Sequence, residues 1–125
     1  DLVLVRDAAG LNIDTIRAVE QALNNRSQLD AVYSMSGGNR AIASTLRHFK
    51  FEPTVFVAHD LDSDNIGLLQ NGVVSHVLHH DLEADMAQVF RQLCAFHRAM
   101  PAPKPSHRSD VQIVMAPNIP NRYLQ

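Results

Sequence analysis

Short apolar runs alternate along the chain with longer segments in which apolar residues recur every three or four positions. The runs cover residues 2–5, 31–35, 55–58, 74–78 and 111–115. Runs of this length, separated by Gly, Asn or Pro, predict buried strands. The run at 55–58 is apolar on both pleat faces, which is typical of a strand with helices on both sides of its sheet.

Helical spacing follows each of the first four runs, over residues 12–24, 40–49, 62–69 and 82–100. In the longest of these segments one face carries only large apolar side chains, namely Leu82, Met86, Val89, Phe90, Leu93 and Met100. Prolines end this segment because proline lacks the amide hydrogen and blocks the helical backbone. Residues 101–110 are therefore predicted to form an extended connector that leads to the last strand.

Strands and helices thus alternate in βαβα order, which predicts an α/β fold with a doubly wound, mostly parallel sheet flanked by helices. The chain has 125 residues, and 46% of them are apolar. This length and composition allow one hydrophobic core, so residues 1–125 are predicted to form a single lobe.

The composition argues against several classes of protein. Lys and Arg number 11 against 13 Asp and Glu, a formal charge of −2, so the chain has no basic excess for binding nucleic acid. Cys94 is the only cysteine, which excludes an internal disulfide. No apolar run approaches the roughly 18 residues of a membrane span, and no signal peptide is visible. Because the chain starts at Asp1, inside a predicted strand, we expect it to be cut from a longer protein.

Polar residues follow four of the predicted strands. They occur at Arg6-Asp7, at residues 36–40, at His59-Asp60 and at residues 79–81. In open parallel sheets, ligands bind beyond the carboxyl ends of the strands. We therefore expect these four loops to meet along one edge of the sheet and to form one wall of a site for a small polar ligand.

The turn Ser36-Gly37-Gly38-Asn39-Arg40 is the most informative of these loops. Its glycines allow close backbone approach or a positive φ, and free amides of the next helix begin there. Asn39 offers a donor and an acceptor for a hydroxyl, and Arg40 can make a forked contact with a carboxylate or two hydroxyls. An ordinary tight turn with an Asn cap explains the same residues.

The histidine-containing loops allow two interpretations each. Asp60 can accept hydrogen bonds from ligand hydroxyls, and His59 can stack on a ring; alternatively, Asp60 begins an Asx-turn. His76 and His80 share one face of their strand and His79 faces the other, so a metal site lacks a third ligand with suitable spacing. No metal or cofactor is predicted.

The sequence gives little support for an enzyme. It contains no nucleophile elbow, no HExxH motif, no paired-carboxylate signature and no Walker phosphate loop. Cys94 has apolar neighbours on the long helix, which favours a packed thiol, and Tyr33 lies within a strand and is predicted to be in the core.

Several stretches resemble the ligand-binding domain of LacI/GalR transcriptional regulators and of type I periplasmic sugar-binding proteins. The segment from Asp30 to Ala43, with its Gly-Gly-Asn-Arg turn, is similar to the segment of that family in which a strand, a polar turn and a helix follow one another. Val55 to Leu61 resembles the next strand, Val77 to Asp81 the crossover strand, and Val111 to Pro120 the last strand. The resemblance covers nearly the whole chain in the family's order, but only the second of two lobes.

The resemblance implies a binding module rather than an enzyme. In such proteins a sugar lies between two lobes, and by position Asn39, Asp60 and His80 resemble residues that face the cleft or the hinge. The family often has Gln where this chain has His80, which allows binding to depend on pH. With Arg40, and more weakly His59 and Asp7, these residues form the predicted ligand-binding set.

The resemblance also implies partners and a location. We expect a cytoplasmic homodimer that binds DNA only through a helix-turn-helix domain absent from this chain. The alternatives are a periplasmic sugar-binding protein of a transporter and a flavodoxin-like enzyme or phosphate-binding module.

The long helix at 82–100 belongs to the other lobe in intact relatives. Without that lobe its apolar face loses its usual partners, and burial of each large apolar side chain is worth roughly 1.5–3 kcal/mol. We therefore expect the helix to fold back onto its own lobe or to pack against another copy of the chain.

Overall fold

The computed structural model describes residues 1–6, 12–35, 37–101 and 109–124. Helices and strands follow one another as α1 (Asn12–Leu23), β1 (Ala31–Tyr33), α2 (Asn39–His48), β2 (Val55–His59), α3 (Ser63–Gln70), β3 (His76–His80), α4 (Leu82–Phe96) and β4 (Val111–Val114). The 3₁₀ turns η1 (Ala116–Asn118) and η2 (Asn121–Tyr123) end the described chain. The predicted α/β class is confirmed.

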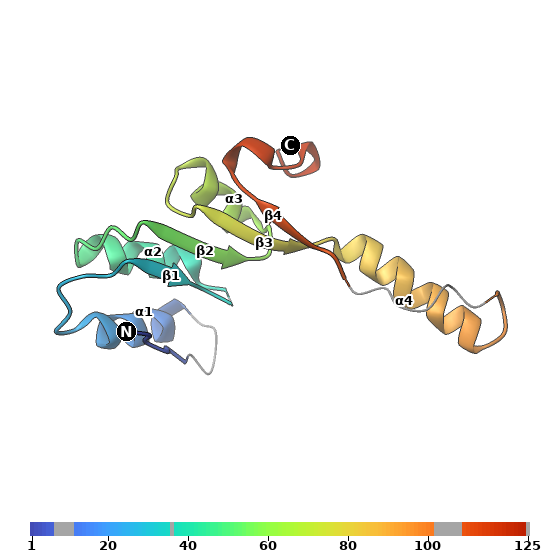
Figure 1. The fold of residues 1–125 in the computed structure, drawn as a ribbon, viewed down its shortest axis with the longest axis horizontal. Coiled ribbons are helices and arrows are strands. Elements are labelled where there is room, and N and C mark those ends of the chain that lie inside the picture. Colours follow the sequence, from blue (N-terminus) through green and yellow to red (C-terminus); the bar gives the residue numbers. More distant parts are fainter. Residues whose placement is uncertain (7–11, 36, 102–108, 125) are drawn as a thin grey trace.

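The four strands form one sheet in the order β1-β2-β3-β4 (Figure 1). β1, β2 and β3 are parallel, with Tyr33 opposite Val57 and His59 opposite Leu78. β4 runs antiparallel to β3, and His80 pairs with Val111. The reversal has a simple cause: the chain leaves β3 along α4 and returns from the same end of the sheet, so it enters β4 in the opposite direction.

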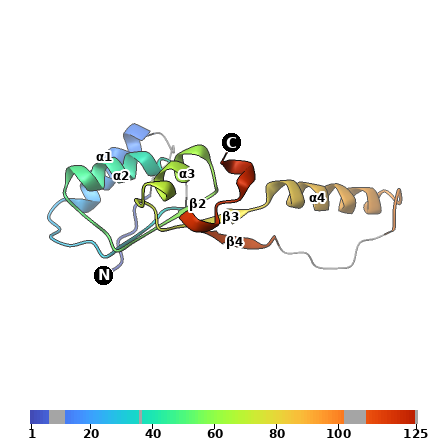
Figure 2. The same cartoon turned by 90° about the horizontal axis from the view of Figure 1, so that it is seen from above.

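Helices α1, α2 and α3 lie on one side of this sheet (Figure 2). Because β1, β2 and β3 follow one another in the same direction and crossovers between parallel strands are right-handed, both crossover helices fall on the same face. The core lies under these helices, where Phe56, Ala58, Leu69 and Val77 are almost fully buried. The opposite side of β2, predicted to be covered as well, is only half-buried.

The predicted strand at residues 2–5 is not formed. Residues 1–6 have no strand assignment, and the side chains of Leu2 and Leu4 are 95% and 64% exposed. A strand exists only when its backbone pairs with a neighbour. In the described part of the chain β1 pairs with β2 alone, so this apolar run has no partner.

Two local features show why the helices start where they do. Asp62 caps α3 by accepting a hydrogen bond from the amide of Asn65 at 2.7 Å. α2 follows Gly38, whose φ of +79° is left-handed and costs glycine little. A Cβ at Gly38 would lie 3.1 Å from Thr15 Oγ1, so this glycine also lets α1 and α2 pack closely.

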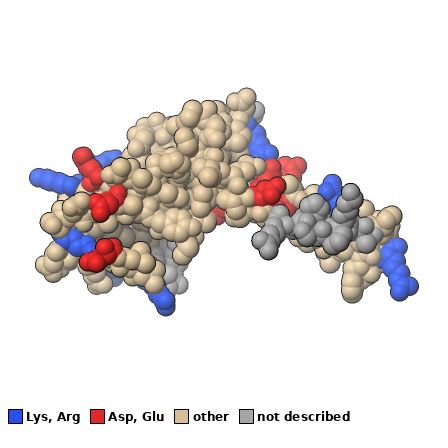
Figure 3. Space-filling model, in the orientation of Figure 1, with Lys and Arg blue, Asp and Glu red and all other residues tan. Residues whose placement is uncertain are grey.

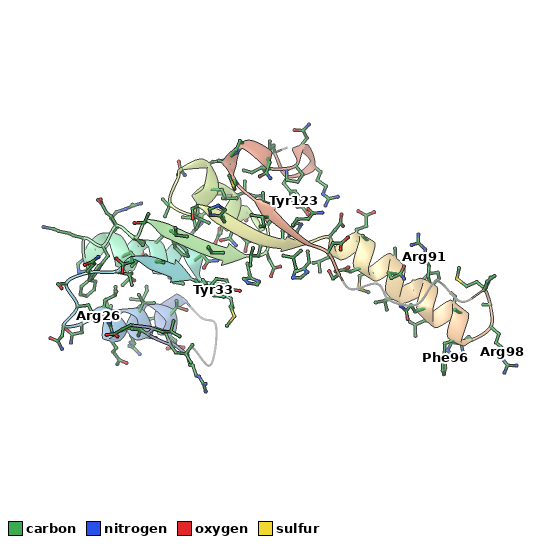
Figure 4. The ribbon with its side chains drawn as sticks, in the orientation of Figure 1. Arg26, Tyr33, Arg91, Phe96, Arg98 and Tyr123 are labelled. Carbon is green, nitrogen blue, oxygen red and sulfur yellow. The ribbon has the colours of Figure 1, made fainter. Side chains whose placement is uncertain are left out.

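Helix α4 projects away from the lobe and none of its residues is buried (Figures 1 and 4). It ends at Phe96 rather than at Met100, four residues earlier than its apolar spacing predicts. The expectation that α4 folds back onto its own lobe is therefore wrong. The side chain of Asp81 caps α4 by accepting a hydrogen bond from the amide of Ala84, and Ser109 donates a hydrogen bond to Asp85. These two hydrogen bonds fix the direction in which α4 continues from β3. No described helix is long and apolar enough to cross a membrane.

Candidate functional site

The polar loops meet at the edge of the sheet where the parallel strands end. The strand arrows of β1, β2 and β3 all point toward α4 in Figure 1. The start of α2 follows β1, Asp60 follows β2 directly, and His80 is the last residue of β3. Asn39, Asp60 and His80 therefore lie along one rim of the sheet. Asp7 lies outside the described residues, as does Ser36.

Asn65 of α3 organises the centre of this rim. Its side-chain amide donates to the carbonyl oxygens of His59 at 2.8 Å and of Asp60 at 2.7 Å. Its Oδ1 accepts from the Nδ2 of Asn39 at 2.9 Å. Both asparagines are buried, with exposed fractions of 1% for Asn65 and 3% for Asn39. One buried amide thus joins the start of α2, the end of β2 and the start of α3.

Asp60 is presented to solvent by this network. Its backbone has a φ of +63°, a left-handed conformation that Asp tolerates better than most residues. Hydrogen bonds at both ends hold it there, because its amide donates to the carbonyl of Leu78 and its carbonyl accepts from Asn65. The helix cap belongs to Asp62, so the exposed carboxylate of Asp60 has no capping role.

His59 and Tyr33 form an aromatic pair beside Asp60. The Tyr33 hydroxyl lies 2.7 Å from Nε2 of His59, and the two rings are tilted with centroids 5.4 Å apart. Tyr33 is 57% exposed, so its predicted place in the core is wrong. β1 is an edge strand, and the described helices do not cover the face that carries Tyr33.

Arg40 and His80 have partners within the chain. Nε of Arg40 lies 2.7 Å from Oδ1 of Asp64, and both side chains are more than half exposed. The hydroxyl of Ser109 donates to Asp85 at 2.6 Å, so Nδ1 of His80, at 3.1 Å, donates to Ser109. His80 is therefore attached to the base of α4, while Arg40 lies on the surface beside α3.

His79 precedes His80 in β3 and is buried on the opposite face of the strand, as the alternation of side chains along a strand predicts. Its Nδ1 accepts from the amide of Leu61 at 3.3 Å, so Nε2, 3.1 Å from the Tyr123 hydroxyl, carries the ring hydrogen. Burial is the main cause that lowers the pKa of His79 below its ordinary value near 6.5. Beside it, Arg122 lies 3.1 Å from the carboxylate of Asp81.

The capping bond from Ala84 and the Arg122 guanidinium lower the pKa of Asp81. A shallow hollow of about 220 Å³ lies next to the rim and is lined by His79, Asp81, Leu82, Glu83, Arg122 and Tyr123. Its volume is below the roughly 300–1,000 Å³ of a complete ligand pocket. A larger hollow of about 450 Å³ lies at the opposite end of β2, around Lys50, Pro53 and Gly72. No cluster of three metal-binding side chains occurs among the residues that the structure describes.

Spacing along the chain gives no sign of Asn65, Tyr33 or Tyr123, because each meets its partner only through the fold.

The fold is that of one lobe of a type I periplasmic-binding-protein-like domain. The chain is similar to GanP, a glucose-galactose binding protein from Geobacillus stearothermophilus, with a TM-score of 0.75 and 13% identity over 88% of this chain and 40% of that one. It is also similar to AraP, an arabinose binding protein from the same organism, with a TM-score of 0.69 and 14% identity over 94% of this chain and 44% of that one.

A further similar structure, from Bacteroides fragilis, is assigned as a LacI transcriptional regulator. Its TM-score is 0.70 and its identity 16%, over 88% of this chain and 38% of that one. The chain thus spans about two fifths of the length of these proteins. No protein-family model and no curated protein matches the sequence.

Proposed function

We propose that this chain is one lobe of a sugar-binding module and forms one wall of the ligand cleft. The observation that carries the proposal is the network around Asn65, which fixes the exposed Asp60 carboxylate at the rim of the sheet. Ligands of parallel α/β sheets bind at this rim. The similarity of the fold to glucose-galactose and arabinose binding proteins favours a sugar among small polar ligands.

We infer different roles for the predicted residues from their surroundings. Asp60 offers carboxylate oxygens to sugar hydroxyls, and the His59–Tyr33 pair offers aromatic surface and polar tips. Asn39 is buried against Asn65, so its role is to hold the rim in shape. Arg40 is held beside Asp64 through its Nε, and His80 is held beside Ser109 through its Nδ1, so a ligand would meet the other nitrogens of these side chains.

We further propose that the intact protein is a cytoplasmic transcriptional regulator of the LacI type, acting as a homodimer. Closure of the cleft would then be coupled to DNA binding through the different ligand affinities of two states. The Gly-Gly-Asn-Arg turn supports this proposal over a transport receptor. The fold is compatible with both, because it is similar to the Bacteroides fragilis protein and to the sugar-binding proteins alike. The coding sequence upstream of Asp1 distinguishes the two: a helix-turn-helix supports the regulator, and a secretion signal supports the transport receptor.

Titration of the ¹⁵N-labelled chain with glucose, galactose and arabinose tests the sugar site. We expect amide shifts concentrated at residues 59–61 and weak affinity, because one wall leaves most of a ligand in water. Asp60→Asn keeps a side chain that tolerates the left-handed backbone but removes the charge, and should weaken binding about fivefold. Glu52→Gln, at the opposite end of β2, should leave affinity unchanged. Shifts centred on the amino ends of the strands, or tight binding at a 1:1 ratio, would contradict the proposal.

A further inference from the structure

His79 joins the loop that carries Asp60 to the C-terminal turn η2. Its side chain is buried, with 5% of the residue exposed, and its Nδ1 accepts a hydrogen bond from the amide of Leu61 at 3.3 Å. On the other side of the ring, Nε2 lies 3.1 Å from the hydroxyl of Tyr123, and the two rings meet edge to face with centroids 5.6 Å apart. Leu61 follows Asp60 directly, so this buried ring is bonded to the backbone of the candidate site.

Only the neutral form of His79 fits this arrangement. The Leu61 amide can only donate, so Nδ1 keeps its lone pair, and Nε2 carries the hydrogen that it donates to the Tyr123 hydroxyl. In the protonated ring both nitrogens carry hydrogens. The hydrogen on Nδ1 would then face the hydrogen of the Leu61 amide, and two donors repel each other. Protonation of this one ring therefore breaks the hydrogen bond next to Asp60.

Charged groups from every neighbouring segment act on this ring. Asp60, in the loop after β2, and Asp81, at the start of α4, favour the protonated form. Arg122 in η2 and His80 in β3 disfavour it. Figure 3 shows acidic and basic groups close together where α4 leaves the lobe. The hollow beside the ring is lined by two further titratable side chains, Glu83 and Tyr123. Burial has the largest effect and lowers the pKa of His79, so the neutral form predominates at pH 7.

Protonation of His79 would act on Asp60 in two ways. Asp60 has a left-handed backbone, with a φ of +63°, which depends on the hydrogen bonds of the loop around it. Loss of the bond from Leu61 frees this loop on its C-terminal side. The positive ring also attracts the Asp60 carboxylate, which would turn toward the lobe and away from a ligand. Both effects remove the carboxylate from the position in which it would meet sugar hydroxyls.

We propose that protonation of His79 releases the loop that carries Asp60 and thereby weakens ligand binding at the rim in acid. His79 is a positioning residue, because it acts through the Leu61 amide and does not itself contact the ligand. This regulation rests on the proposed sugar site. Binding and protonation are linked, so a ligand that requires neutral His79 also lowers the pKa of that ring. Below this pKa the affinity should fall by up to about tenfold per pH unit.

NMR spectra of the ¹⁵N-labelled chain without ligand test the coupling of the ring to the loop. His59→Gln is introduced first, because His59 is the other histidine next to this loop. Between pH 8 and pH 5 we expect the amide signal of Leu61 to shift with the same midpoint as the ring of His79. The amide signals of α1 should not follow this titration and show that the chain stays folded.

His79→Asn, added to the same chain, is the matched variant. Its side-chain amide offers an oxygen near the position of Nδ1 and does not titrate, so the Leu61 signal should stay constant over this pH range. A Leu61 signal that does not move when His79 is present would overturn the proposal. So would a Leu61 signal that moves as much in His79→Asn as it does with the histidine.

Sugar affinity measured at two pH values tests the effect on binding. Chains with His59 intact are titrated with glucose, galactose and arabinose at pH 7.5 and at one unit below the midpoint of His79. The wild-type chain should bind about tenfold more weakly at the lower pH. His79→Asn should bind equally at both. His79→Leu cannot accept from the Leu61 amide and should bind weakly at both.

His48→Gln is the control, because it removes an exposed histidine of α2 and should keep the wild-type dependence on pH. Wild-type affinity that is equal at the two pH values would refute the regulation and leave the sugar site standing. Absence of binding by every variant at both pH values would instead refute the proposed sugar site. The Leu61 titration would then decide by itself whether His79 controls the loop.

Discussion

At the scale of the residue, one buried amide accounts for the shape of the candidate site. Asn65 satisfies two carbonyl oxygens of the loop after β2 and accepts from Asn39 at the start of α2. Buried polar groups without partners are costly, so these bonds are required once the loop is closed. Asp60 keeps its left-handed backbone and its exposed carboxylate because Asn65 holds the carbonyl groups of His59 and of Asp60 itself.

Replacement of Asn65 by alanine should therefore destabilise the chain. The change removes the acceptor of the Asn39 amide and the donor of two carbonyl groups, and we expect a loss of about 1–3 kcal/mol in the free energy of unfolding. Urea denaturation followed by circular dichroism measures it. Asn71→Ala is the matched control, because Asn71 also donates to a backbone carbonyl but lies at the exposed end of α3; it should cost less than about 0.5 kcal/mol. Equal losses in the two variants would show that the network is not what holds the rim.

At the scale of the element, the turn before α2 shows how backbone geometry and packing act together. Gly38 has a positive φ and faces Thr15 of α1, whereas a Cβ added at Gly37 would have no atom within 4 Å. The adjacent glycines of the turn therefore have different roles. Gly38 permits the close packing of α1 on α2, whereas Gly37 lies in open space.

Gly38→Ala should destabilise the chain by about 1–2 kcal/mol, because alanine adds a left-handed strain and a Cβ close to Thr15. Thermal or urea unfolding gives the value. Gly37→Ala should change stability by less than about 0.5 kcal/mol. A neutral effect of Gly38→Ala would show that α1 moves away without cost, and the close packing of α1 on α2 would then not be important for stability.

At the scale of the whole molecule, titratable side chains hold the C-terminal turn η2 against the end of β3 and the start of α4. His79 contacts Tyr123 and the amide of Leu61, and Arg122 pairs with Asp81 at the start of α4. The pKa values of His79 and Asp81 are both lowered in the folded chain. For both groups the unfolded chain binds the proton more readily, so acid favours unfolding.

Stability should therefore be constant above pH 6.5 and fall as the pH decreases below it, first through His79. The slope from this one proton is at most about 1.4 kcal/mol per pH unit. Asp81 adds a second loss below its ordinary value near 3.8. Urea midpoints measured from pH 5 to 8 report this dependence of stability on pH. The decrease of the midpoint below pH 6.5 should disappear in His79→Gln and remain in His48→Gln, since His48 is exposed. An unchanged slope in His79→Gln would show that another group causes the acid sensitivity.

A large part of the fold and of the rim follows from the sequence. The periods of apolar residues predict the described helices and four strands, and the rule for parallel sheets places Asn39, Asp60 and His80 at one edge. These inferences succeed because spacing along the chain sets which side chains share a face. The partners of the site residues do not follow, because Asn65, Tyr33 and Tyr123 meet Asn39, His59 and His79 only after distant segments pack together.

Local patterns in the sequence are enough to establish the α/β class, the parallel order of β1 to β3 and the apolar stripe of α4, since all three depend on periodicity. Whether an apolar segment is buried depends instead on the packing of the whole chain. Residues 2–5 have the composition of a strand and α4 has the pattern of a packed helix, yet both are exposed in this chain. The physical reason is that hydrogen-bond pairing and burial require a second surface, and the pattern of one segment does not specify where that surface comes from.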